Sequence, residues 1–210
     1  MDKIQKWQKE IEEITGDVED LLYSKYHADE LEKIIKENDF VKQHIGSFWE
    51  HYKLNYTFFI ISKIWHQIDT DSDSLSLINL LKDLLSNHKL ITKNWWVSQG
   101  PNVLSSEEFE EKFGKGDFLD SKLVSEDIKN LEGAAKEIKQ FRNKNVGHKD
   151  NTGKFPSNIS YTKIKDAMNQ IEALVIKYQL LLTQSGYSSL TPVADDWQVA
   201  FTEPWIKKEE

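Results

Sequence analysis

The residues best suited to chemistry lie in the stretch FRNKNVGHKD, residues 141–150. Arg142 is the only arginine among the 27 lysine and arginine residues of the chain, and His148 follows it six positions later. A guanidinium stays protonated and offers a fork of N–H donors to an anion, whereas an imidazole gives or takes a proton near neutral pH. The pair could therefore stabilise charge on a phosphorane-like transition state and move its protons.

The spacing of the two residues requires a break in the helix between them. On a continuous helix six residues turn through about 240° net, so His148 would point away from Arg142. Gly147 can release the chain from helical geometry and swing the imidazole back beside the guanidinium. Asn143 adds an amide that can hydrogen-bond to either group. These observations make Arg142, Asn143 and His148 the candidate site.

Two long helices are expected to hold this segment. A helix begins near Ser121, and its apolar residues step by three and four from Ile128 to Ile138, so that the next position of the stripe falls on Arg142. A guanidinium at such a position needs an anionic partner, a solvated cleft or another subunit. After a loop, the apolar spacing predicts a last long helix over residues 160–184.

The remainder of the chain also reads as helices. The apolar spacing predicts a first helix that ends at Gly16 and a second, short one over residues 27–38. Residues 39–69 are expected to form one central helix and residues 75–88 another. Between residues 89 and 117 the periodicity weakens, which indicates an excursion or insertion.

The predicted fold class is an all-α bundle of four to five main helices, because strand signals are weak and the chain has only 4 prolines and 9 glycines. We expect N-terminal helices over 1–38 packed on the body, a helical bundle over 39–185, and an irregular tail over 186–210.

Composition narrows the class of protein. With 39% hydrophobic and 30% charged residues, no cysteine and no long apolar run, we expect a cytoplasmic protein that does not engage a membrane. The net charge of -8 disfavours a protein that binds nucleic acid over its whole surface. Residues 136–154, however, carry six basic and two acidic side chains, a local net charge of +4. A solvated lysine-rich helix face is the simpler interpretation of that window.

Other candidate sites carry weaker signals. The histidines at positions 44, 51 and 66 lack the i, i+4 spacing of paired metal ligands, and DTDSDS lacks the glycine and glutamate of a calcium loop, so no metal site is predicted. Trp95 and Trp96 could stack on nucleobases, but an aromatic pair is more often packing.

The segment R-N-K-N-V-G-H-K-D resembles the R-x(4-6)-H signature of the HEPN superfamily (higher eukaryotes and prokaryotes nucleotide-binding), and its R-N-K…H-x-D form is most similar to the abortive-infection subgroup. The resemblance covers residues 40–185. It implies a helical bundle that forms a homodimer with a composite active site, and RNA cleavage without metal or cofactor. Arg142 and His148 would be the catalytic pair, with Asn143 tuning them.

The resemblance also implies a mechanism and partners. The 2'-hydroxyl of RNA would attack its own phosphate and leave a 2',3'-cyclic phosphate, so DNA would survive. Lys139, Lys144 and Lys149 would guide RNA to the cleft. As a toxin or abortive-infection effector in phage defence, the protein would need a cognate inhibitor, as in toxin-antitoxin pairs.

Two alternatives stand beside this hypothesis. Structurally, Arg142 could pair with Glu137 or Asp150, and His148 could cap a helix C-terminus, where the helix dipole favours a cation. Functionally, the chain could be a non-catalytic HEPN-like module that binds a nucleotide or a protein partner.

Overall fold

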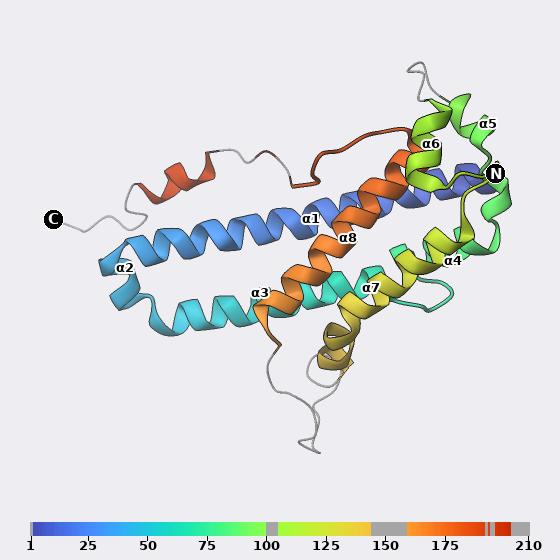
Figure 1. Cartoon of the computed structure of the whole chain (residues 1–210). Helices are drawn as coiled ribbons and strands as arrows, with labels where there is room; N and C mark the ends of the chain where they lie inside the picture. Colours follow the sequence, from blue (N-terminus) through green and yellow to red (C-terminus); the bar gives the residue numbers. More distant parts are fainter. Residues whose placement is uncertain (1, 100–104, 144–158, 192, 194–195, 203–210) are drawn as a thin grey trace.

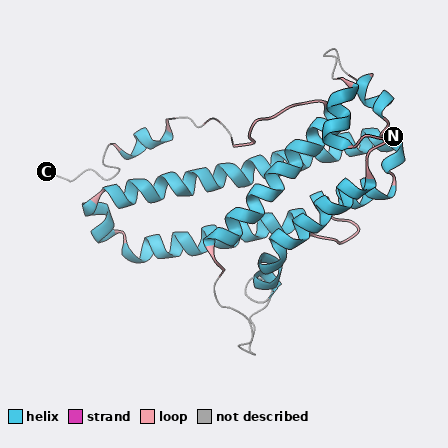
Figure 2. Cartoon of the chain, viewed as in Figure 1, coloured by secondary structure: helices cyan, strands magenta, loops and turns pink. Residues whose placement is uncertain are grey.

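The computed structural model describes residues 2–99, 105–143, 159–191, 193 and 196–202 (Figure 1). These residues form α-helices and short 3-10 helices, and no strand occurs within the described ranges (Figure 2). The elements are α1 (Lys3–Glu37), α2 (Asp39–His44), α3 (Gly46–Ile68), α4 (Leu77–Ser86), η1 (His88–Leu90), α5 (Lys93–Val97), α6 (Ser106–Phe113), α7 (Ser121–Phe141), α8 (Tyr161–Thr183) and η3 (Trp197–Phe201). The all-α prediction is confirmed.

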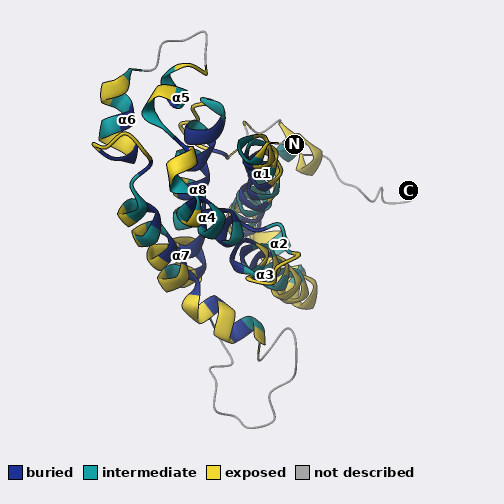
Figure 3. Cartoon of the chain, turned by 90° about the vertical axis from the view of Figure 1, so that its right-hand side faces the viewer, coloured by how far each residue is buried: buried dark blue, intermediate teal, exposed yellow. Residues whose placement is uncertain are grey.

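Five helices build the bundle and share one core. α8 packs along α1 and α7, α3 lies against both α1 and α7, and α4 packs on α7. Their inward faces contribute a single cluster of buried side chains, which includes Trp7, Ile64, Leu81, Leu131 and Ile171. Figure 3 shows the buried residues on the sides of the helices that face one another. Burying each such aliphatic side chain stabilises the fold by about 1.5–3 kcal/mol, so the core fixes the helices that carry the candidate site.

The prediction that a helix ends at Gly16 is wrong, because α1 continues from Lys3 to Glu37. A glycine inside a helix costs about 1 kcal/mol relative to alanine. Buried residues on both sides of it, among them Ile14, Val18 and Leu21, pack into the bundle and hold the helix together. Their burial outweighs the local cost.

The prediction of one helix over residues 39–69 is also wrong. The chain breaks at Ile45, between α2 and α3, and Gly46 follows with φ of 30°, a value that residues with a side chain rarely adopt. The Asn38 side chain accepts a hydrogen bond from the Val41 N–H and so begins α2 after the end of α1. The short α2 therefore turns the chain between the antiparallel α1 and α3, which form a hairpin (Figure 1).

The segment from residue 89 to 117 forms short helices around an aromatic cluster. Trp96, Phe109 and Phe113 are fully buried, with ring centroids 5.6–5.7 Å apart. Gly114 closes α6 with φ of 115°, and a Cβ there would lie 2.5 Å from the Asp120 Cβ. Trp96 is therefore a packing residue, which is the role that an adjacent aromatic pair most often has.

The chain after α8 follows α1 as a strap. The Glu172 carboxylate accepts hydrogen bonds from the Ser189 hydroxyl and the Leu190 N–H, and the Leu190 side chain is buried. Farther on, the Trp197 ring stacks on His27 of α1 at a centroid distance of 4.8 Å. The division of the chain at residues 38 and 185 stays a prediction.

One polar contact at the start of α1 predicts an acid-sensitive stability. Partial burial acts to raise the pKa of Asp83, but hydrogen bonds from Trp7 Nε1 and Lys3 outweigh it and lower the pKa overall. A carboxyl whose pKa is lower in the folded state stabilises the fold above its unfolded pKa of about 3.9 and loses this contribution as pH falls through the folded value. The free energy of unfolding of wild type should therefore exceed that of Asp83→Asn by a margin that shrinks between pH 5 and pH 2.

Urea unfolding of both proteins at several pH values checks this expectation. Glu126→Gln, which removes an exposed carboxyl from α7, is the matched control. An equal margin at pH 2 and pH 7 would contradict the assignment to Asp83.

Candidate functional site

Arg142 lies immediately after α7, and the prediction that it takes the next position of the apolar stripe is wrong, because Phe141 takes that position. The backbone of Arg142 is still helical, and its N–H donates to the carbonyl oxygens of Ile138 and Lys139. Phe141 occupies the buried position at the end of the apolar stripe, and the Arg142 side chain lies beside it, half-buried. The guanidinium therefore borders the core without entering it, which leaves its N–H donors able to meet an anion.

The guanidinium of Arg142 packs on the ring of Trp65 in α3. The guanidinium carbon of Arg142 lies 4.6 Å from the centroid of the Trp65 ring. Lys139, one turn earlier on α7, places its Nζ 5.6 Å from the same centroid. Each such cation–π contact is worth about 0.5–2 kcal/mol, and the aromatic face fixes the plane of a guanidinium. Two cations gathered on one indole create a local positive field that favours binding of a phosphate.

Asn143 contacts the guanidinium as the sequence suggested. Its Oδ1 accepts a hydrogen bond of 3.3 Å from Arg142 Nη1. The amide thus occupies one N–H of the fork, and no other described residue accepts a hydrogen bond from the guanidinium.

Glu137 forms an ion pair with a lysine of α8. Its carboxylate lies 3.2 Å from Lys163 Nζ at the start of α8, so this residue links the end of α7 to the beginning of α8 across the intervening segment. The alternative in which Glu137 neutralises Arg142 does not hold in the structure. The other acidic partner considered, Asp150, lies outside the described residues.

The remaining predicted site residues lie outside the described part of the chain. These are His148 together with the lysines Lys144 and Lys149. The described residues define the helices on either side of this segment. Arg142 and Asn143 follow the end of α7, and α8 begins at Tyr161. The convergence of His148 on Arg142 stays a prediction.

Sequence reasoning missed Trp65. It lies 77 positions before Arg142, so no local pattern connects the two. A weak signal existed, because Trp65 falls beside the stripe formed by Ile60, Ile61 and Ile64 and is only half-buried. A large aromatic residue at the edge of a buried face is a candidate partner for a cation on a neighbouring helix.

His66 and His44, two of the histidines considered as metal ligands, contact residues of the bundle. His66 lies beside Asp17 of α1, with Nδ1 3.4 Å from its carboxylate, and His44 Nδ1 contacts the Phe40 carbonyl. Within the described ranges, no group of three or more His, Asp or Glu side chains is placed to hold a metal ion. None of the helices described here combines the length and apolar character needed to cross a membrane.

Comparison with known proteins gives one result. The family model HEPN_AbiU2, described as AbiU2, matches residues 4–202, a span that includes the bundle and the strap. Searches of curated proteins and of solved structures give no match. The matched span contains the Arg142 segment and both helices that frame it.

Proposed function

The chain belongs to the AbiU2 family of HEPN proteins, a group of the abortive-infection type, and from this premise we propose that it is a metal-independent endoribonuclease. The observation that carries the proposal is the guanidinium of Arg142, which lies 4.6 Å from the centroid of the Trp65 ring beside Lys139 at the end of α7. Such an arrangement provides a preorganised anion site of the kind that stabilises charge in a transition state.

In the proposed reaction the 2' oxygen of a ribose forms a bond to the adjacent phosphorus, and the bond from phosphorus to the 5' oxygen breaks. Arg142 binds the non-bridging oxygens, on which negative charge accumulates. The proton of the 2'-hydroxyl passes to His148, and the imidazolium so formed gives a proton to the departing 5' oxygen. The products are a 2',3'-cyclic phosphate and a 5'-hydroxyl, and no metal is required. Asn143 orients the guanidinium through its hydrogen bond.

We further propose that two copies pair to form one cleft from two motifs. Lys139, Lys144 and Lys149 would then line the approach for RNA, since lysines near the phosphate backbone provide a sequence-independent attraction. The acidity of the rest of the chain, with a net charge of -8, would limit RNA binding elsewhere on its surface. An enzyme of this kind acts as a toxin and needs a cognate inhibitor.

Expression in a bacterial host tests the function. Wild type should arrest growth and fragment cellular RNA, whereas Arg142→Ala and His148→Ala should do neither. Lys129→Ala, which removes an exposed lysine nearer the start of α7, is the control and should behave as wild type. Equal growth of all four strains with intact RNA would overturn the proposal and favour a non-catalytic binding module.

Trp65 makes a further prediction as the positioning residue for Arg142. Trp65→Leu should lower kcat/KM for RNA about 2-fold to 30-fold, because it removes cation–π contacts worth about 0.5–2 kcal/mol. Trp65→Phe keeps an aromatic face and should recover most of the loss. Steady-state cleavage kinetics measure both, and thermal unfolding checks that the variants fold.

A control separates this effect from loss of any half-buried tryptophan. Trp95→Leu removes such a residue from α5 and should leave kcat/KM unchanged. Cleavage by Trp65→Leu at the wild-type rate would show that the indole does not position the guanidinium.

A further inference from the structure

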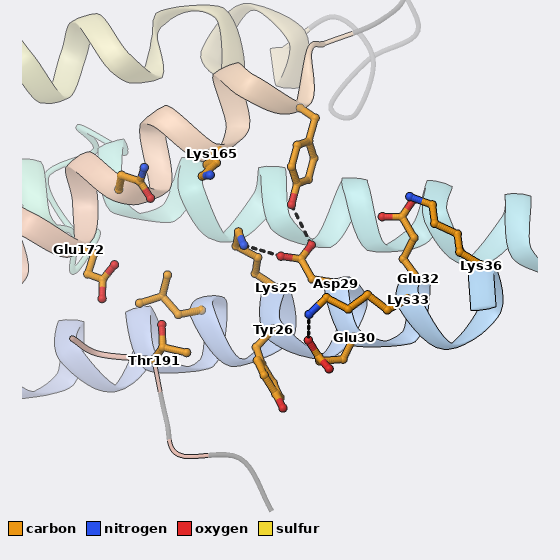
Figure 4. A pocket seen from close by; sticks show the side chains of 13 residues that line it. Lys25, Tyr26, Asp29, Glu30, Glu32, Lys33, Lys36, Lys165, Glu172 and Thr191 are labelled. Atoms are coloured by element: carbon orange, nitrogen blue, oxygen red, sulfur yellow. Dashed lines mark hydrogen bonds and ion pairs between the residues drawn. The ribbon is translucent and has the colours of Figure 1, made fainter. Parts of the chain in front are cut away.

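A groove of two chambers lies between α1, α3 and the first half of α8, apart from the Arg142 site. The first chamber, of about 470 Å³, is lined by four lysines and four carboxylates: Lys25, Lys33 and Lys36 from α1 and Lys165 from α8, with Asp29, Glu30, Glu32 and Glu172. Figure 4 shows Lys165 on α8 across from Lys25 and Asp29 on α1. Most of the side chains that line this chamber are charged or polar.

The second chamber, of about 380 Å³, has an aromatic wall. Trp49, Tyr52 and Tyr56 follow one another at steps of three and four along α3 and lie on one face of the helix. Their rings are nearly parallel: Trp49 and Tyr52 lie 5.3 Å apart at 12°, and Tyr52 and Tyr56 lie 6.4 Å apart at 3°. All three side chains are half-buried, so the wall borders the groove instead of filling the core.

The two chambers meet at Asp29, Glu32 and Tyr161, which line both of them. A smaller cavity of about 30 Å³, whose lining includes Lys25, Tyr56, Tyr161 and Lys165, shares residues with each chamber. The Tyr161 hydroxyl at the start of α8 donates a 2.8 Å hydrogen bond to Asp29 Oδ1 on α1. Partial burial and then this hydrogen bond raise the pKa of Tyr161 to about 12, so the phenol is a neutral donor at physiological pH. The junction thus offers a carboxylate and a hydroxyl side by side.

The lysines of the groove differ in how they are occupied. Lys25 pairs with Asp29, Lys33 with Glu30 and Lys36 with Glu32. Among the described residues, no carboxylate lies within ion-pair distance of Lys165, which is exposed. Lys165 is therefore the cation of this groove that can accept a phosphate without giving up a partner.

We propose that this groove is a subsite for one ribonucleotide of the RNA strand, with its base stacked on Trp49 and Tyr52, its ribose hydroxyls at Asp29, and its phosphate at Lys165. Aromatic side chains stack on any base, and a carboxylate accepts hydrogen bonds from ribose hydroxyls. The proposal rests on the proposed function, because it makes the groove a second binding point for the substrate of the Arg142 site.

The groove and the Arg142 site lie on different sides of α3. Tyr56 and Trp65 are nine residues apart on this helix, which corresponds to about 14 Å along its axis and about 180° around it. A strand that contacts both sites therefore passes around α3 and is longer than a few nucleotides. Tyr161, which closes the groove, is the first residue of α8, directly after the segment that carries His148.

Binding can be measured with chemistry blocked. In full-length protein carrying His148→Ala, fluorescence anisotropy gives the Kd of a labelled single-stranded RNA 12-mer. Trp49→Ala with Tyr52→Ala should raise this Kd about tenfold or more. Lys165→Glu should also weaken binding, and DNA of the same sequence should bind less tightly than RNA. Trp49→Phe keeps a stacking face and should bind as the parent does.

The matched control is Lys129→Glu, which makes the same charge change on α7 and lines neither chamber. Unchanged RNA affinity in the groove variants, with folding confirmed by thermal unfolding, overturns the subsite. A free nucleotide has the same base, ribose and phosphate, and adenosine and guanosine 5'-monophosphates test whether it is the ligand. If these nucleotides bind through the groove residues while the groove variants leave RNA affinity unchanged, the assignment to the RNA strand is wrong. RNA that binds through the groove but is never cut by wild type refutes only the proposed function.

Discussion

Arg142→Lys should lower kcat/KM for RNA cleavage by about 100-fold to 1,000-fold, although it keeps the positive charge. Lysine lacks the planar fork that binds two phosphate oxygens at once, and its ammonium does not stack on an indole as a guanidinium does. In the structure Arg142 lies 4.6 Å from the Trp65 ring centroid and hydrogen-bonds to Asn143, and a lysine would keep neither geometry. Cleavage of a labelled RNA under steady-state conditions measures the loss.

The control for this variant is Lys129→Arg, which exchanges the same two side chains in the opposite sense on the same helix. It should leave both activity and stability unchanged, because Lys129 is exposed and lies about three and a half turns before the site. Arg142→Lys should lower the unfolding temperature by only about a few degrees, because it loses one cation–π contact beside the core and no buried packing. Activity of Arg142→Lys within a few-fold of wild type would mean that charge alone suffices.

Trp7→Ala should destabilise the fold by about 3–5 kcal/mol, a large share of the 5–15 kcal/mol typical of a native domain. The Trp7 side chain is fully buried near the start of α1, and its Nε1 donates a 2.8 Å hydrogen bond to Asp83 of α4. Truncation leaves a cavity where α1 meets the bundle and removes one of the donors that hold the Asp83 carboxylate. Urea denaturation followed by circular dichroism gives the free energy of unfolding.

Trp7→Phe separates the two contributions, because it keeps most of the packing and removes only the hydrogen bond. It should cost about 1–3 kcal/mol, the penalty of leaving a polar partner unsatisfied. Trp95→Leu, at a half-buried position, should cost less than Trp7→Ala. A loss below about 1 kcal/mol for Trp7→Ala would contradict the idea that α1 is an integral part of the core.

The helices that frame the site could be read from the sequence because their apolar residues repeat at helical spacing. The stripe from Ile128 to Ile138 indicated α7 and its start near Ser121, and the spacing after residue 160 placed α8 within a residue of both observed boundaries. The breaks were harder to place, because they depend on competition between local cost and burial. The helix continues through Gly16 because the neighbouring residues pack into the core, whereas the chain breaks at Ile45, just before Gly46.

Contacts between helices could not be read from the sequence. Arg142 was found because its residue type is rare in this chain, but Trp65 contacts it only after α3 and α7 have packed. The same holds for the groove, whose aromatic residues Trp49, Tyr52 and Tyr56 repeat at the spacing of a helix face that packs on a core. Of the described residues of α8, only its first, Tyr161, lines the chamber with them, so the same spacing borders an open chamber.

The measurement that tests the central claim most directly is cleavage of an end-labelled RNA by wild type and His148→Ala, each with and without EDTA, with the chemistry of the new ends determined. The account predicts that wild type cuts equally well in EDTA, leaves 2',3'-cyclic phosphate and 5'-hydroxyl ends, and spares DNA of the same sequence, while His148→Ala leaves the RNA whole. Activity that EDTA abolishes, or cleavage by His148→Ala at the wild-type rate, would contradict it.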